Sequence, residues 1–230
     1  MKILAIGDIH GRNCWKQIIQ KELDNVDKIV FIGDYFDSFN VQIIDQINNF
    51  LDILQFKKDN TDKVITLTGN HELHYFKYMR NKYSGYKVAT EIQVADLLEE
   101  EVRNNNLQIA YKVNDILFTH AGVTKTWCNQ NNINYDHVQI DKEINQLFKY
   151  RKEYFDIHIP TNGFGDEIHQ GPLWVRPKSL TEDATPHLHI IGHTHNEMVE
   201  ITETYINIDS LPKQYIIIDS ETKKIEIKNV

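Results

Sequence analysis

The chain has little cysteine. Its 230 residues contain two cysteines, Cys14 and Cys128, and these form no CxxC pair. A disulfide framework or a zinc site built from thiolates needs more cysteines at closer spacing. The sequence therefore excludes both, and we expect two partly buried free thiols in a reducing compartment.

Basic charge and long apolar runs are scarce as well. The 25 Lys and Arg residues stand against 33 Asp and Glu residues, which gives a net charge of −8. Proteins bind nucleic-acid backbones through clustered cations, so we expect no stable nucleic-acid binding. No apolar run approaches the roughly 18 residues of a transmembrane helix, and the opening MKILAIGDIHG is unlike a signal peptide. We therefore expect a cytoplasmic protein with no membrane partner.

The chain contains enough apolar residues for one core, and strand-like segments alternate along it with helix-like segments. Apolar residues make up 41% of the chain, and the length predicts a single domain over 1–230. Short β-branched runs, each leading into a glycine-containing turn, alternate with segments of helical spacing. This alternation predicts an α/β sandwich. The runs lie at 2–6, 28–32 and 63–67, and the predicted helices at 13–23, 41–59 and 89–103.

The second half of the chain has a different order of elements. A strand pair is expected at 107–113 and 115–122, followed by helices within 124–158. Residues 159–186 hold much of the glycine and proline and predict a long loop, which in a compact domain is usually functional. From 187 onward the pattern predicts short, mostly antiparallel strands.

Five polar clusters follow the predicted strands or lie near their ends. Residues at the carboxyl ends of strands in an α/β sheet converge on one crevice, where ligands bind. Carboxylate, imidazole and amide oxygen, without thiolate, suit Mn²⁺, Fe²⁺ or Zn²⁺. The clusters are GDIHG (7–11), GDYFD (33–37), GNHE (69–72), THAG (119–122) and GHTH (192–195), and they supply Asp8, His10, Asp34, Asn70, His71, His120, His193 and His195.

The spacing inside these clusters favours a shared metal centre. Asp8 and His10 are two residues apart and can point the same way from an extended strand end, and His193 and His195 repeat this spacing. Two adjacent cations need a bridging carboxylate, for which Asp34 is the obvious candidate. Paired metals about 3.5–4 Å apart can share a hydroxide and hold a phosphoryl group from both sides.

Taken together in this order, the clusters resemble the calcineurin-like metallophosphoesterase superfamily. GDIHG, GDYFD, GNHE and HAG are most similar to its phosphoprotein-phosphatase-type branch, which includes protein Ser/Thr phosphatases and symmetrical diadenosine tetraphosphate hydrolases. The resemblance extends from residue 3 to about residue 200. It implies a four-layer α/β-β/α sandwich with a dimetal site at the sheet ends. It also implies two divalent metal ions, with Mn²⁺ the first choice and Fe²⁺ or Zn²⁺ the alternatives.

The resemblance also implies a role for each metal ligand. The first metal would be held by Asp8 and His10, with Asp34 bridging to the second. His195 matches a ligand that most of the superfamily adds to the first metal and that protein phosphatases often lack. The second metal would be held by Asn70, His120 and His193.

The remaining roles concern acid catalysis and phosphate binding. His71 matches the general acid that protonates the leaving oxygen, and Asp37 matches the carboxylate that orients it. The chain departs from the branch at Ser38 and Phe39, where the branch has Arg-Gly and the arginine grips phosphate. We expect Arg176 to replace that arginine, with Arg12 as the second choice.

These roles predict a dimetal phosphoester hydrolase, a phosphatase in which a metal-bridging hydroxide attacks phosphorus and His71 protonates the leaving group. The substrate would be a phosphorylated protein or a small phosphate ester. A nucleotide phosphodiesterase or dinucleoside polyphosphate hydrolase is the alternative. A catalytically inert metal-binding docking module is a further alternative, which the filled ligand positions disfavour.

Four polar residues in or near these clusters are not expected to be metal ligands. His187 and His189 are assigned to packing or to hydrogen bonds behind the ligands. Glu72 is expected to accept hydrogen bonds that tie down its loop, and His74 to be solvated or to line a pocket.

Overall fold

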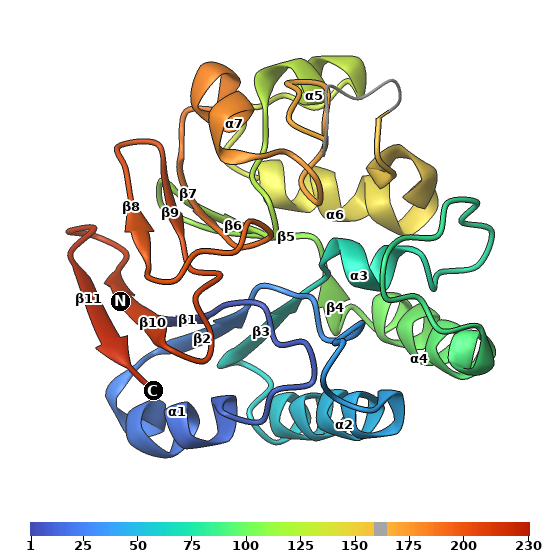
Figure 1. Cartoon of the computed structure of the whole chain (residues 1–230). Coiled ribbons are helices and arrows are strands. Elements are labelled where there is room, and N and C mark those ends of the chain that lie inside the picture. Colours follow the sequence, from blue (N-terminus) through green and yellow to red (C-terminus); the bar gives the residue numbers. More distant parts are fainter. Residues whose placement is uncertain (159–164) are drawn as a thin grey trace.

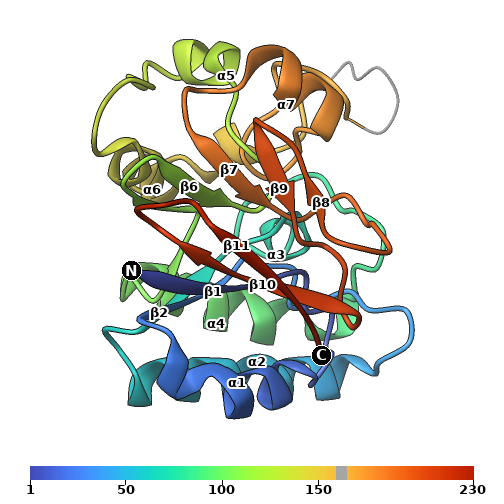
Figure 2. The ribbon, with the colours of Figure 1, turned by 90° about the vertical axis from the view of Figure 1, so that its left-hand side faces the viewer.

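Two β-sheets pack face to face between two layers of helices (Figures 1 and 2). The computed structural model describes residues 1–158 and 165–230. The four layers confirm the predicted α/β-β/α sandwich. Among the residues that the structure describes, no helix is long and apolar enough to cross a membrane.

The larger sheet is parallel in its N-terminal part and antiparallel at one edge. Strands β1 to β4 are parallel neighbours, β10 pairs antiparallel with β1, and β11 pairs antiparallel with β10. Its order is β11 (Ile225–Asn229), β10 (Gln214–Asp219), β1 (Lys2–Ile6), β2 (Lys28–Phe31), β3 (Val64–Leu67) and β4 (Leu107–Gln108).

The smaller sheet is built from the second half of the chain. Strand β7 lies at its centre and is parallel to both of its neighbours, β6 and β9. The order is β5 (Ala110–Val113), β6 (Ile116–Thr119), β7 (Leu188–Ile191), β9 (Tyr205–Asn207) and β8 (Glu200–Ile201).

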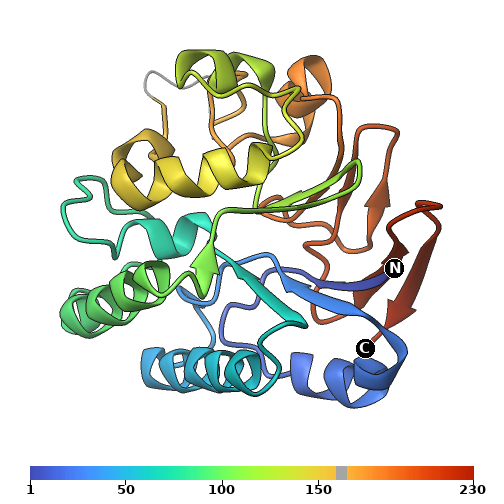
Figure 3. The same ribbon diagram turned by 180° about the vertical axis from the view of Figure 1, so that it is seen from behind.

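Helices cover the outer face of each sheet (Figures 1 and 3). The larger sheet carries α1 (Trp15–Glu22), α2 (Ile43–Asp59) and α4 (Glu91–Arg103), while α5 (Lys125–Gln130), α6 (Ile140–Tyr150) and α7 (Pro177–Asp183) cover the smaller sheet. A single helical turn, α3 (Asn70–Leu73), follows β3. Short 3₁₀ turns occupy Leu23–Asn25, Val88–Thr90 and Lys152–Phe155.

The alternation of side chains along a strand explains why β1 is apolar on both faces. Ile3 and Ala5 belong to the apolar cluster between the two sheets, whereas Leu4 and Ile6 belong to the cluster beneath the helices. A strand that is covered on both faces has no solvent side, so it shows a continuous apolar run. The N-terminal runs therefore predicted the buried parallel strands correctly.

Three predictions about elements need correction. The expected strand at 107–113 is two strands, β4 and β5, which lie in different sheets. The loop predicted for 159–186 contains α7 in its described part, whereas residues 159–164 lie outside the described residues. The C-terminal strands are antiparallel at β8, β10 and β11, but the central strand β7 is parallel to its neighbours.

Candidate active site

All five polar clusters begin at or just after the carboxyl end of a strand. They follow β1, β2 and β3 of the larger sheet and β6 and β7 of the smaller one. Because the strands of each set are mutually parallel, each sheet delivers its clusters to one edge. Contacts between clusters from different sheets show that these two edges meet, as when the His193 backbone N–H donates to Asp8 Oδ2 at 3.1 Å.

The backbone at the site is locally strained. Among the described residues, nine other than glycine have a positive φ, and four of them carry predicted site side chains. Such a conformation is unfavourable for a residue with a Cβ and persists where the surroundings fix it, often at functional sites. The four residues are His10 (φ 42°), Asp34 (52°), Asp37 (63°) and His193 (64°).

Two glycines allow the clusters to approach each other closely. A Cβ on Gly192 would lie 2.0 Å from Asp8 Oδ1, and a Cβ on Gly69 would lie 2.1 Å from Asp34 Oδ1. Neither distance is possible for real atoms, so any larger residue would displace the carboxylate. The glycines that open GNHE and GHTH thus set the distance between strands at the site.

Asp34 is the centre of the site. Its carboxylate forms one group with His10 and His71 and a second group with Asp8 and His120, and the possible ligand atoms within each group lie within 4.8 Å of one another. The sharing of Asp34 agrees with the bridging position expected for it. The grouping of the other residues differs in part from the expectation, because Asp8 lies with His120 and His71 lies with His10.

Hydrogen bonds to backbone carbonyls fix the tautomers of two histidines. His10 Nδ1 lies 2.6 Å from the Phe36 carbonyl oxygen and His120 Nδ1 lies 3.0 Å from the Ile32 carbonyl oxygen, so both Nδ1 atoms must donate. The other nitrogen, Nε2, then faces Asp34 Oδ2, at 3.6 Å for His10 and 3.3 Å for His120. A neutral imidazole would direct a lone pair at this carboxylate. A cation between the two groups resolves that conflict.

A second convergence involves the amide of Asn70. Its Oδ1 lies 2.8 Å from His120 Nε2 and 3.0 Å from His193 Nδ1. His193 Nε2 is buried and has no hydrogen-bond partner among the described residues. The structure therefore brings together the three side chains expected around the second metal.

The charges at the site also fit a bound cation. Burial raises the pKa of Asp8 well above its usual range, and the carboxylates of Asp209 and Asp34 act in the same direction. Burial also opposes the ionisation of Asp34, but the imidazoles of His120 and His71 hold its pKa well below the usual range. Three buried carboxylates this close together carry excess negative charge. Oxygen and imidazole donors around such charge suit a divalent cation of the Mn²⁺, Fe²⁺ or Zn²⁺ type.

His71 and Asp37 form the expected pair. His71 Nδ1 lies 2.9 Å from Asp37 Oδ2, and the backbone N–H of His71 donates to Asp34 Oδ1 at 3.0 Å. Burial disfavours the imidazolium, but Asp34 and Asp37 together raise the pKa of His71 to about 9. With Nδ1 occupied by Asp37, Nε2 of His71 is the nitrogen available for proton transfer.

Glu72 holds the backbone behind the site, as expected. It is fully buried, and its two carboxylate oxygens accept from four backbone N–H groups at 2.7–3.3 Å. Burial and the neighbouring Asp34 raise the pKa of Glu72 to about 7. The four donors belong to Gly69, Asp34, Tyr35 and Phe36, so Glu72 joins the GNHE and GDYFD clusters.

His195 lies at the margin of the site. Its side chain is 66% exposed, and its Nδ1 lies 3.5 Å from Asp209 Oδ1. Asp209 itself is buried, and its charge raises the pKa of Asp8. The sequence-based prediction missed Asp209, although it also follows a strand end, two residues after β9.

Both candidate arginines lie beside the site. Arg12 Nη1 donates to the Asp8 carbonyl oxygen at 3.2 Å, and its charge acts on the pKa of His10. Arg176 Nη1 donates to Thr194 Oγ1 at 3.1 Å, and its charge acts on His193. Arg12 therefore lies beside Asp8 and His10, and Arg176 lies beside His193.

His187 and His189 have the surroundings expected for them, whereas His74 does not. His187 Nδ1 and His189 Nε2 each lie 3.2 Å from Thr185 Oγ1, behind the GHTH cluster. His74 is completely buried, and its Nε2 lies 2.7 Å from Asp37 Oδ2. The expectation of a solvated or pocket-lining His74 was wrong.

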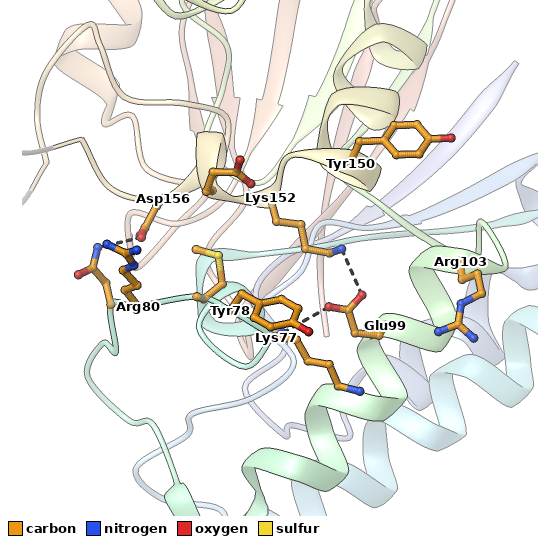
Figure 4. Close-up of a pocket in the computed structure, with 11 residues that line it drawn as sticks. Lys77, Tyr78, Arg80, Glu99, Arg103, Tyr150, Lys152 and Asp156 are labelled. Carbon is orange, nitrogen blue, oxygen red and sulfur yellow. Dashed lines mark hydrogen bonds and ion pairs between the residues drawn. The ribbon is translucent and has the colours of Figure 1, made fainter.

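A hollow of about 810 Å³ lies between α4, the end of α6 and the segment after α3 (Figure 4). Lys152 points toward Glu99 across it, with Nζ and Oε2 3.1 Å apart. Exposed Tyr78 and Tyr150 also line the hollow. None of the predicted site residues does, so size alone does not identify the chemical site.

Comparisons with known proteins agree with this geometry. The family model for calcineurin-like phosphoesterase matches residues 1–197. The metallophosphoesterase from Sphaerobacter thermophilus has a similar fold, with 15% sequence identity and a TM-score of 0.51 over 100% of this chain and 88% of that chain. The search of curated proteins gave no match. Since the family model spans most of the chain and includes all five clusters, the chain belongs to the calcineurin-like phosphoesterases and is a metal-dependent phosphoesterase.

Proposed function

We propose that the chain is a phosphatase of the phosphoprotein-phosphatase-type branch that uses two divalent cations, with Mn²⁺ ahead of Fe²⁺ and Zn²⁺. One observation carries the proposal: Asp34 is shared by two groups of candidate ligands, and the His71–Asp37 pair lies directly beside it. A buried carboxylate common to two donor groups suits a two-cation centre.

The proposed ligands follow from the donor sets. Asp8, His10 and Asp34 would hold one cation, and Asn70, His120 and His193 would complete the second around Asp34. His195, whose ring is 66% exposed, would be a further ligand of the first cation. Bound there, the cations would supply a hydroxide nucleophile at neutral pH and neutralise charge on the phosphoryl oxygens.

The protein's own contribution to the reaction is proton transfer and orientation. Asp37 accepts from His71 Nδ1 and so presents Nε2 to the site. His71 would release its Nε2 proton to the leaving oxygen of the ester, which would otherwise depart as an alkoxide. Arg176 and Arg12 would bind phosphate oxygens in place of the missing arginine after Asp37.

For the substrate we propose a phosphomonoester, either a phosphorylated protein or a small phosphate ester. A nucleotide phosphodiesterase or dinucleoside polyphosphate hydrolase is the second candidate, favoured by the absent Arg-Gly and by the presence of His195. Hydrolysis of a panel of monoesters, diesters and dinucleoside polyphosphates with Mn²⁺ separates the two. We propose that the enzyme acts in the cytoplasm.

The first prediction concerns His71. His71→Ala should lower kcat for a monoester with a poor leaving group by at least about tenfold, the scale of general acid catalysis, with metal content unchanged. Steady-state kinetics and metal analysis of the same preparations test it. Unchanged turnover of phenyl phosphate would exclude this role for His71.

The inert docking module makes the opposite prediction. Purified protein with no activity on any ester would favour it. The filled donor positions and the intact His71–Asp37 pair argue against it.

A further inference from the structure

Three polar side chains surround the Asp37 carboxylate, and His71 is only one of them. Its Oδ2 lies 2.9 Å from His71 Nδ1 and 2.7 Å from His74 Nε2, and its Oδ1 accepts from the Tyr75 hydroxyl at 2.7 Å. Asp37 is 1% exposed, so water does not compete for these positions. The carboxylate that orients the general acid is thus itself oriented by two neighbouring residues.

The tautomer of His74 is fixed by the backbone. The N–H of Tyr83 donates to His74 Nδ1 at 3.0 Å, so this nitrogen carries a lone pair and the proton resides on Nε2. The Tyr83 ring stacks on His74 at an interplanar angle of 15°, and Tyr86 meets it edge-on at 75°. The His74 ring is therefore held in one orientation, with the protonated Nε2 placed 2.7 Å from Asp37 Oδ2. This close contact is electrostatic, because the Nε2–H group is not aligned with Oδ2 as a hydrogen bond.

The chain from Tyr83 to Lys87 closes over the same carboxylate. Gly85 has a φ of +90°, and a Cβ there would lie 2.5 Å from the Cβ of Asp37. The backbone N–H of Lys87 donates to the Tyr75 hydroxyl at 3.0 Å, which directs that hydroxyl proton toward Asp37. The segment from Tyr83 to Lys87 thus packs around the Asp37 side chain.

We propose that His74 is a positioning residue for the general acid. By holding Asp37 through the oxygen that it shares with His71, His74 fixes the direction in which His71 Nε2 points. Without it, only His71 lies beside that oxygen, and the Asp37 carboxylate can rotate away from His71. This inference rests on the proposed function, in which His71 protonates the leaving oxygen.

Substrates that differ in leaving group separate positioning from folding. Phenyl phosphate needs a general acid, whereas the leaving group of 2,4-dinitrophenyl phosphate departs without one. His74→Phe keeps the ring stack and removes the donor, so kcat for phenyl phosphate should fall by at least about tenfold while kcat for the dinitrophenyl ester stays within about twofold. KM should stay unchanged for both. Equal losses on both esters would overturn the proposal.

A double-mutant cycle and a rescue sharpen the test. If His74 acts through His71, adding His74→Phe to His71→Ala should lower the phenyl phosphate rate no further. His74→Gln should restore most of the rate, because its amide nitrogen can donate to Asp37 from about the place of Nε2. If His74→Phe does not fold, His74→Asn takes its place in these experiments, because the asparagine side chain is too short to reach Asp37. Additive losses, or no rescue by Gln, would contradict the proposal.

A control variant and a second measurement distinguish failure of the His74 proposal from failure of the proposed phosphatase function. His137→Gln removes an exposed histidine that pairs with Glu143, and it should leave all rates unchanged. Wild-type protein that hydrolyses neither aryl ester, no phosphorylated protein and no other ester of the panel would refute the proposed function. In that case ¹⁵N-histidine NMR still tests positioning: His74→Phe should shift the His71 Nδ1–H resonance, and an unshifted resonance would overturn the inference.

Discussion

Glu72 shows how a residue outside the candidate ligand set determines where the ligands lie. Each of its oxygens accepts from two backbone N–H groups, and these belong to the segments that carry Asp34 and Asn70. A buried N–H that loses its acceptor costs about 1–3 kcal/mol. The position of Asp34 therefore depends on an acceptor that touches no metal.

Glu72→Gln should lower the free energy of unfolding by about 2–4 kcal/mol, because either orientation of the amide turns an NH₂ group toward two donors. Urea unfolding of the metal-free protein measures it. Glu221→Gln, in the exposed turn before β11, is the control and should show no measurable change. Equal midpoints for Glu72→Gln and wild type would show that the four hydrogen bonds contribute nothing net.

Which site residues the sequence could predict depends on whether their position follows from a strand end. The GNHE motif sufficed to predict that Glu72 accepts hydrogen bonds that tie down its loop, and the structure confirms this. His74 was mispredicted because its burial depends on the course of the chain after α3, which ends at Leu73, and the sequence does not show that course. Asp209 was missed because β9 lies beside β7 in space, and this pairing is not visible in the sequence.

At the scale of elements, the strands act as spacers that bring distant clusters together. Strand β1 ends before Asp8 and β7 ends before Gly192, although 185 residues separate Asp8 from His193. The apolar runs at 2–6, 28–32 and 63–67 predicted β1, β2 and β3 well, because buried parallel strands are apolar on both faces. The division of 107–113 between two sheets was not predictable, since it depends on which partner each short strand finds.

Gly192→Ala tests this spacing. The added methyl would lie 2.0 Å from Asp8 Oδ1, so Asp8 must move and the donor set around it must open. We expect affinity for Mn²⁺ to fall by at least about tenfold, the lower end of what displaced ligand supports cost. Isothermal titration calorimetry measures it, with the exposed-turn variant Glu221→Gln as the control. Equal Mn²⁺ affinity in Gly192→Ala and wild type would contradict the argument.

At the scale of the whole molecule, one buried histidine links stability to pH. His189 lies within β7 with no exposed surface, and burial lowers its pKa to about 4. Between about pH 6.5 and pH 4 the unfolded chain binds a proton at His189, whereas the folded chain does not. Stability is therefore fully present above about 6.5 and is lost as the pH falls toward about 4.

His189→Gln should remove that part of the pH dependence. Relative to the variant, wild type should lose up to about 3 kcal/mol of unfolding free energy between pH 6.5 and pH 4. Denaturant unfolding at several pH values gives the difference, with His137→Gln as the exposed control. Parallel curves for wild type and His189→Gln would show that His189 does not titrate as argued.

The central claim is that Asp34 is shared by two divalent cations that hydrolyse a phosphoester, and turnover during Mn²⁺ titration of metal-free protein tests it most directly. We predict that phenyl phosphate hydrolysis is absent without metal and reaches its plateau at two Mn²⁺ per chain. We also predict that Asp34→Asn lowers the plateau by at least about a hundredfold, since it removes the bridging charge. Turnover that survives chelation, a plateau at one Mn²⁺ per chain, or full activity in Asp34→Asn would contradict the account.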